Sequence, residues 1–115
     1  MKKLTKTLAL CLFSLAIFSS CEKEDEPVVV AKITYDKDIK TILVTNCSPC
    51  HLAGGANPNK WDQFAVAQSK IITILDRVQR EPGTTGFMPR NGTMKLSADN
   101  IAKLKQWVTD GLLEK

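Results

Sequence analysis

The chain has 115 residues, of which 24% are charged and 43% hydrophobic, with a formal net charge of +4. These values are typical of one globular domain, and they exclude a wholly disordered chain and a polytopic membrane protein. The excess of positive charge is too small and too scattered for a nucleic-acid-binding surface, so we expect no nucleic-acid partner.

Residues 1–20 have the pattern of an export signal. Three lysines precede the uncharged stretch from Leu8 to Phe18, which is too short to span a bilayer as a helix. Two serines then lead to Cys21. This arrangement resembles a bacterial lipoprotein signal, in which that cysteine is lipidated and becomes the mature N-terminus, although Phe18 stands where such signals usually have leucine. The alternative is ordinary secretion, with Cys21 as a free thiol.

An acidic run, Glu22–Glu26, begins a linker that we expect to cover residues 21–34. The run resembles the tag that sends some lipoproteins of Bacteroidota to the cell surface, and the alternative is a solvated tether. We therefore expect an extracytoplasmic domain, residues 35–115, that is anchored by lipid to a bacterial membrane. Its place is the periplasmic face or the cell surface of the outer membrane.

Apolar residues in this domain recur at helical spacing. Ile39, Ile42 and Leu43 mark one face of a helix over residues 36–45. A second helix is predicted over residues 61–79, either continuous or broken near Ala67. Its apolar residues are Phe64, Ile71, Leu75 and Val78.

The last helix is predicted to begin after Ser97, whose hydroxyl is a good N-cap, and to end at Gly111. Its apolar face includes Ile101, Leu104 and Trp107. No segment alternates polar and apolar residues over four or more positions, so the predicted class is all-α.

The loop between Arg80 and Lys95 is rich in glycine and proline, and it is too long and too polar to order itself by apolar burial. Long loops in compact domains are usually functional. A domain this small generally needs a staple or a cofactor in addition to its core. We therefore expect a large apolar group between this loop and the helices.

The sequence Cys47-Ser48-Pro49-Cys50-His51 has the pattern C-x-x-C-H, the attachment motif of c-type haem. Two thiols one turn apart can add across the two haem vinyl groups, and the histidine that follows can bind the iron. A structural zinc site needs four ligands, and this domain has only three cysteine or histidine side chains. A thioredoxin-like dithiol needs a βαβ context that is missing here. A Cys47–Cys50 disulfide stays open as an alternative.

The segment from Phe87 through Met88-Pro89 to Gly92, with Leu96-Ser97 and Trp107-Val108-x-x-Gly111, resembles the C-terminal half of small bacterial class I cytochromes c. The spacing Ile39-x-x-x-Leu43-x-x-x-Cys47 resembles short cytochrome c modules of Bacteroidota and Planctomycetes. The resemblance implies three to four helices around one covalently bound haem c. It also implies that Met88 is the sixth iron ligand, with Met94 as the competitor.

Other residues have supporting roles in this interpretation. The Nδ1 atom of His51 should donate to a carbonyl near Pro58, and Trp107 should pack the last helix on the first. Residues expected to line the haem are Phe64, Ile71, Leu75, Phe87 and Leu96, although the first three could equally fill a helix core. Candidates to neutralise the haem propionates are Trp61, Arg77, Arg80 and Arg90.

The expected function is electron transfer with unidentified redox partner proteins, and not enzymatic catalysis. Two axial protein ligands, His51 and Met88, leave no iron position for a substrate. Two alternatives stay open: a five-coordinate haem sensor or peroxidase-like module, and a surface lipoprotein without haem.

Overall fold

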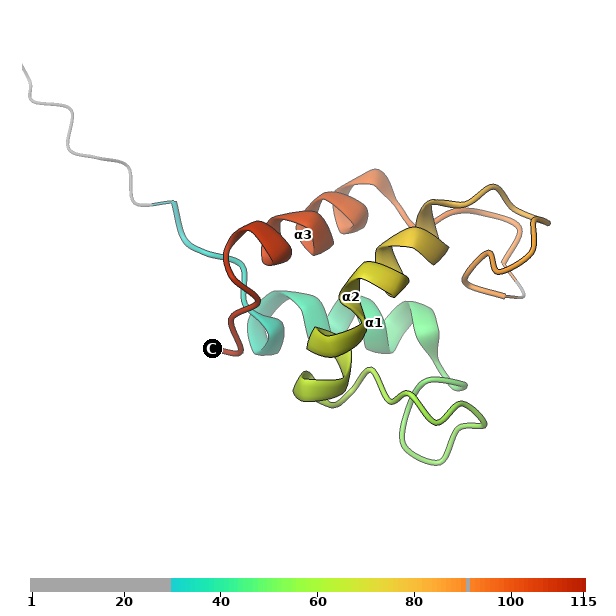
Figure 1. Cartoon of the computed structure of the whole chain (residues 1–115), viewed down its shortest axis with the longest axis horizontal. Coiled ribbons are helices and arrows are strands. Elements are labelled where there is room, and N and C mark those ends of the chain that lie inside the picture. Colours follow the sequence, from blue (N-terminus) through green and yellow to red (C-terminus); the bar gives the residue numbers. More distant parts are fainter. Residues whose placement is uncertain (1–29, 91) are drawn as a thin grey trace, which may run out of the picture.

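The computed structural model describes residues 30–90 and 92–115, so the predicted export signal, Cys21 and the acidic run lie outside the described residues. The chain forms a π-helical turn η1 (Tyr35–Ile39) followed by the helices α1 (Lys40–Cys47), α2 (Phe64–Gln79) and α3 (Ala98–Thr109). Figure 1 shows the helices packed together, with the loops that follow α1 and α2 at the end of the domain away from its termini. The prediction of an all-α fold is confirmed.

The first predicted helix is present and longer than expected, because η1 and α1 together extend from Tyr35 to Cys47. Cys47 consequently lies in the last helical turn. No helix in the described part of the chain is long and apolar enough to cross a membrane.

The second helix begins three residues later than predicted and is not broken near Ala67. The main-chain groups of Trp61 form hydrogen bonds outside the helix: its N–H donates to the His51 carbonyl, and its carbonyl accepts from the Tyr35 hydroxyl. Ala67 is fully buried and its N–H continues the helical ladder to Gln63. A small residue at this position allows close packing rather than a break.

The last helix has the predicted ends. The Ser97 hydroxyl accepts a hydrogen bond of 3.2 Å from the Asn100 N–H, which satisfies one free donor of the first turn. At the other end Gly111 has a φ of +95°, a conformation that favours glycine, and it follows the helix after Asp110.

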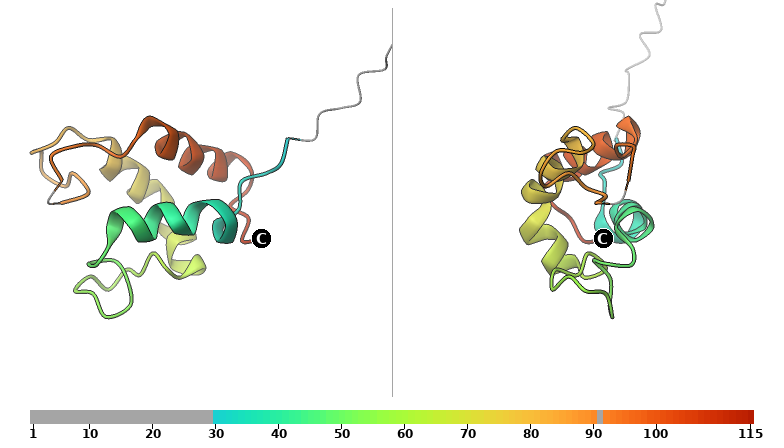
Figure 2. Two further views of the ribbon diagram at one scale, coloured as in Figure 1. Left: turned by 180° about the vertical axis from the view of Figure 1, so that it is seen from behind. Right: turned by 90° about the vertical axis from the view of Figure 1, so that its right-hand side faces the viewer.

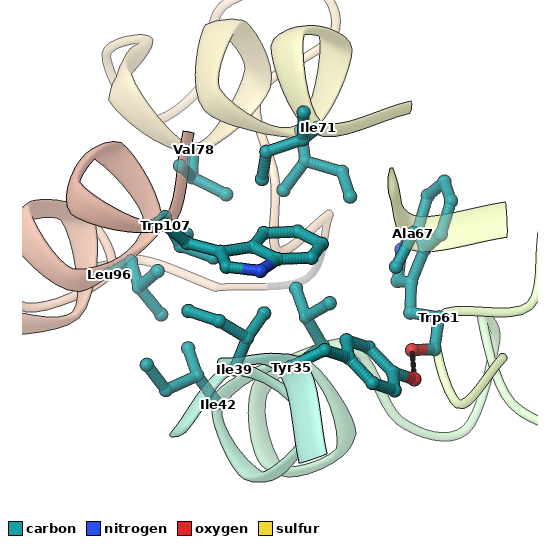
Figure 3. Packing of buried hydrophobic residues seen from close by; sticks show 12 residues of the cluster. Tyr35, Ile39, Ile42, Trp61, Ala67, Ile71, Val78, Leu96 and Trp107 are labelled. Carbon is teal, nitrogen blue, oxygen red and sulfur yellow. Dashed lines mark hydrogen bonds between the residues drawn. The ribbon is translucent and has the colours of Figure 1, made fainter. Parts of the chain in front are cut away.

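The core surrounds Trp107, which is completely buried between the first helical segment and α2 (Figure 3). Its ring centroid lies 5.9 Å from that of Tyr35, and its indole N–H donates to the Leu113 carbonyl at 2.8 Å. The prediction that Trp107 packs the last helix on the first is confirmed.

The two ends of the described domain pair with each other. Thr34 forms a parallel bridge with Leu113, and the Ile33 N–H donates to the Asp110 carboxylate at 2.7 Å. The hydrogen bonds that the Asp110 carboxylate accepts from the Ile33 N–H and from the Gln106 amide hold its pKa below the usual range. Residues 33 and 34, assigned to the linker from sequence, are thus packed against the domain.

Tyr35 provides a test of the core, because its hydroxyl donates to the buried Trp61 carbonyl at 2.6 Å. Tyr35→Phe should lower the free energy of unfolding by about 1–3 kcal/mol, since it leaves that carbonyl without a donor. Urea denaturation at neutral pH measures the change. Ser69→Ala is the control: its exposed hydroxyl bonds only within α2, so the expected loss is below about 0.5 kcal/mol.

The stabilities of the wild-type protein and of Tyr35→Phe should also depend differently on pH in the alkaline range. Burial, followed by the charges of nearby carboxylates, raises the pKa of Tyr35 to about 12. Tyrosine in an unfolded chain ionises near pH 10. The stability that Tyr35 adds is therefore complete below about pH 10 and is lost as the pH rises from there towards 12. A stability difference between wild type and Tyr35→Phe that stays constant from about pH 8 to 11 would contradict this.

Candidate functional site

A cavity of about 790 Å³ lies between the loop after α1, the C-terminal half of α2 and the loop after α2. This is within the range of about 300–1,000 Å³ for small-molecule and cofactor sites. Cys47 lines it from the end of α1, Cys50 and His51 line it from the loop that follows, and Met88 lines it from the loop after α2. Four residues singled out from the sequence thus meet at one cavity, whereas Cys21 lies outside the described residues.

The C-x-x-C-H segment continues directly from α1. The His51 N–H donates to the Cys47 carbonyl at 3.1 Å, so the motif forms one further turn of chain. Both cysteines are free thiols, Cys47 partly buried and Cys50 exposed. Burial raises the pKa of the Cys47 thiol to about 11, so this thiol is protonated at neutral pH.

The His51 imidazole is buried and oriented by its surroundings. Its Nδ1 atom lies 3.0 Å from the carbonyl oxygen of Asn59. Because that oxygen only accepts, Nδ1 bears the proton and Nε2 keeps a lone pair for a metal ion. The predicted carbonyl near Pro58 is confirmed, at the residue that follows this proline.

Trp61 supports the histidine from behind. Its ring stacks on the imidazole, with centroids 4.5 Å apart and planes at 12°. Its main-chain N–H donates to the His51 carbonyl at 2.7 Å. It also lines the cavity, and it is itself buried. Its stacking on His51 was not predicted, since no pattern in the sequence links the two residues.

The two methionines of the second loop are placed differently. Met88 is partly buried, packs against the core and lines the cavity. Met94 is 79% exposed and is not among the residues that line it. The structure therefore brings Met88, and not Met94, to the same cavity as His51.

None of the five residues expected to line the haem lines this cavity, and for Phe64, Ile71 and Leu75 the alternative of a helix core is confirmed. Most of them pack in or against the core, and Phe87 is buried beside a smaller cavity of about 520 Å³. The apolar wall from α2 consists instead of Ile74 and Val78. The apolar stripe of α2 is wide, and the sequence does not show which edge faces the core.

Three basic side chains line the cavity, and no carboxylate does so among the described residues. Arg77 and Arg90 were predicted near the propionates, and Lys70 was missed, although it lies two turns before Arg77 on the same face of α2. Arg80, also predicted, does not line the cavity, because it pairs with Asp76 and the Thr85 carbonyl.

These features fit haem c. Two thiols and an imidazole lone pair lie at one side of a partly apolar cavity, a thioether reaches it from another loop, and basic groups match two carboxylates of the cofactor. A small all-α fold with this site defines a c-type cytochrome domain.

The comparison with protein families agrees with this class. The family described as cytochrome c oxidase, cbb3-type, subunit III matches residues 36–108, more than half of the chain, and the chain belongs to this family. Searches of curated proteins and of solved structures gave no match. The domain is accordingly a c-type cytochrome module, which implies haem c and haem-based electron transfer.

The loop after His51 folds back tightly on the C-x-x-C-H segment. The Asn57 N–H donates to the Cys50 carbonyl at 3.0 Å, and the Lys60 amine donates to the Gly55 carbonyl at 2.8 Å. A Cβ atom on Gly55 would lie 2.1 Å from the Pro49 oxygen and 2.5 Å from the Cys50 oxygen. Only glycine fits without displacing the backbone that bears the second thiol.

Gly55→Ala should therefore reduce the ratio of bound haem to protein severalfold, because the Cys50 backbone must move. Gly54→Ala is the matched control: its φ is +80°, but an added Cβ would meet no atom within 4 Å, so it should cost only about 1 kcal/mol. Haem is measured as its pyridine complex and protein by amino-acid analysis. Equal haem content in the two variants would contradict the argument.

Proposed function

We propose that the protein is an extracytoplasmic electron carrier with one haem c, bound covalently through Cys47 and Cys50. We further propose His51 and Met88 as the two axial ligands of the iron. The observation that supports this most directly is that all four residues line one cavity.

Each residue has a defined task in this proposal. Cys47 and Cys50 would hold the haem through two thioether bonds, with each S–H adding across one vinyl group so that sulfur bonds to one carbon and hydrogen to the other. His51 offers Nε2 to the iron because Nδ1 is held by the Asn59 carbonyl. When bound, haem supplies a one-electron couple between ferric and ferrous iron, and a methionine ligand raises its potential relative to a second histidine.

The proposed ligation favours electron transfer over catalysis. Two protein ligands leave no free iron position for a substrate, and His51 is the single histidine of the sequence, so no second imidazole can serve as a distal acid or base. Trp61, Ile74 and Val78 give this cavity an apolar wall. The remaining step is electron exchange with a partner redox protein.

We also propose that the domain is held at a membrane by lipid on Cys21. The support is the export-signal pattern that ends at this cysteine and the acidic run that follows it. The export signal would carry the domain out of the cytoplasm, to the side where c-type haem is attached, and the lipid would hold it at the membrane.

The first experiment tests covalent attachment in protein that is co-expressed with a haem-maturation system. Haem should remain with the protein after acid–acetone extraction, the pyridine complex should show a c-type α-band, and the mass should correspond to one haem. Haem-free protein with a Cys47–Cys50 disulfide would contradict the proposal and favour the alternative of a lipoprotein without haem.

Met88→Ala tests the sixth ligand. The ferric protein should show the weak far-red band of a sulfur–iron bond, and this variant should lose it, bind CO in the ferrous form and have a lower reduction potential. Met94→Ala is the control and should leave all three unchanged, because Met94 is exposed. The reverse result would assign the bond to Met94. Absence of the band from wild type would favour a five-coordinate sensor or peroxidase-like module.

Cys21→Ser tests the anchor by fractionation of cells into membrane and soluble parts. The variant should leave the membrane fraction, or keep its signal, because the lipid acceptor is gone. Cys11→Ser, a change within the apolar stretch of the signal, should leave the distribution unchanged. Wild-type distribution of Cys21→Ser would reject lipidation.

A further inference from the structure

The loop with Met88 is attached to the last two turns of α2 by three hydrogen bonds. The Met88 N–H donates to the Arg77 carbonyl at 3.2 Å, and the Arg77 guanidinium donates to the Gly86 carbonyl at 3.2 Å. Arg80 donates to the Thr85 carbonyl at 2.6 Å. Three carbonyl or amide groups within four successive residues are thus bound by two arginines.

The arginines lie directly against the backbone of the loop. A Cβ atom on Gly86 would lie 2.2 Å from the Arg77 Nη1 atom and 2.5 Å from the Arg80 Nη1 atom. Gly86 also has a φ of +82°, which other residues rarely adopt. The absence of a side chain at this point is what lets both guanidinium groups reach the main chain.

The loop has few other polar attachments to the rest of the domain. Among the described residues from 81 to 96, the other hydrogen bonds join the loop to itself, including the ion pair between Lys95 and Glu81. The apolar anchors are the buried side chains of Phe87 and Leu96. Within the described part of this segment, every hydrogen bond to a helix therefore involves Arg77 or Arg80.

Arg80 is itself oriented by Asp76, which lies one turn earlier in α2. The carboxylate accepts from the guanidinium at 2.6 Å and 3.4 Å, while another nitrogen remains free to donate to Thr85. Because one planar guanidinium makes both contacts, lysine cannot reproduce them together.

We propose that Arg77 and Arg80 are positioning residues for the sixth ligand: they fix the loop so that the Met88 sulfur is presented to the cavity. The inference rests on the proposed ligation by Met88. A neutral thioether is a weak ligand, so the fraction of time it stays bound depends on how firmly its loop is fixed. Releasing the loop would open the sixth position without altering the ligand itself.

Arg80 gives the cleaner test, because it does not line the cavity and acts only through the loop. Arg80→Ala in the haem-loaded protein should raise the CO association rate of the ferrous form by about tenfold, as expected for one charged hydrogen bond. The far-red band of the ferric form should disappear at a lower temperature than in wild type, before the helical circular dichroism is lost. Arg80→Lys should fall between the two, since it restores one contact.

Gln79→Ala is the matched control. Gln79 lies in the same turn of α2 and its side chain bonds only to the Leu75 carbonyl of that helix, so CO binding and the far-red band should match wild type. Unchanged CO binding in Arg80→Ala would overturn the proposal, as would loss of the band and of the helical signal at one shared temperature. If the wild-type protein lacks the far-red band and Met88→Ala does not change CO binding, the result would instead reject the ligation by Met88 on which the proposal rests.

Discussion

The position of Trp61 determines how the site is joined to the rest of the molecule. Its ring stacks on His51, and its main-chain N–H donates to the His51 carbonyl. Its main-chain carbonyl accepts from the Tyr35 hydroxyl in the core. Figure 3 shows the last of these contacts. The first helical segment, the C-x-x-C-H turn and the start of α2 therefore meet at one residue. A shift of any of them would move the imidazole.

The two proposed ligands are fixed by different means. His51 lies in the hydrogen-bonded turn after α1, and it is held by an aromatic stack and a backbone carbonyl. Met88 lies in a loop that is attached by guanidinium groups to main-chain oxygens. The loop with Met88 is the element expected to open first, because exposed hydrogen bonds break more readily than a buried core.

Local patterns explain why much of the fold could be predicted. Helical spacing identified the helices, the Ser97 cap identified a boundary, and C-x-x-C-H identified the haem-binding turn, since each depends on neighbouring residues. Long-range contacts decided the rest. Hydrogen bonds made by Trp61 delay the start of α2, and packing decides that Ile74, not Ile71, faces the cavity. The role of Arg80 leaves no sequence pattern, because its partner in the loop is a carbonyl group that every residue has.

The pairing of Thr34 with Leu113 has an architectural consequence. Both ends of the domain emerge together, at the end opposite the two loops, as Figure 1 and the left view of Figure 2 show. Additional polypeptide joined at either end would leave on the same side and would not cover the cavity. The geometry is therefore that of a modular unit, which can be linked in series with other domains or held on a stalk while the mouth of its cavity faces outward.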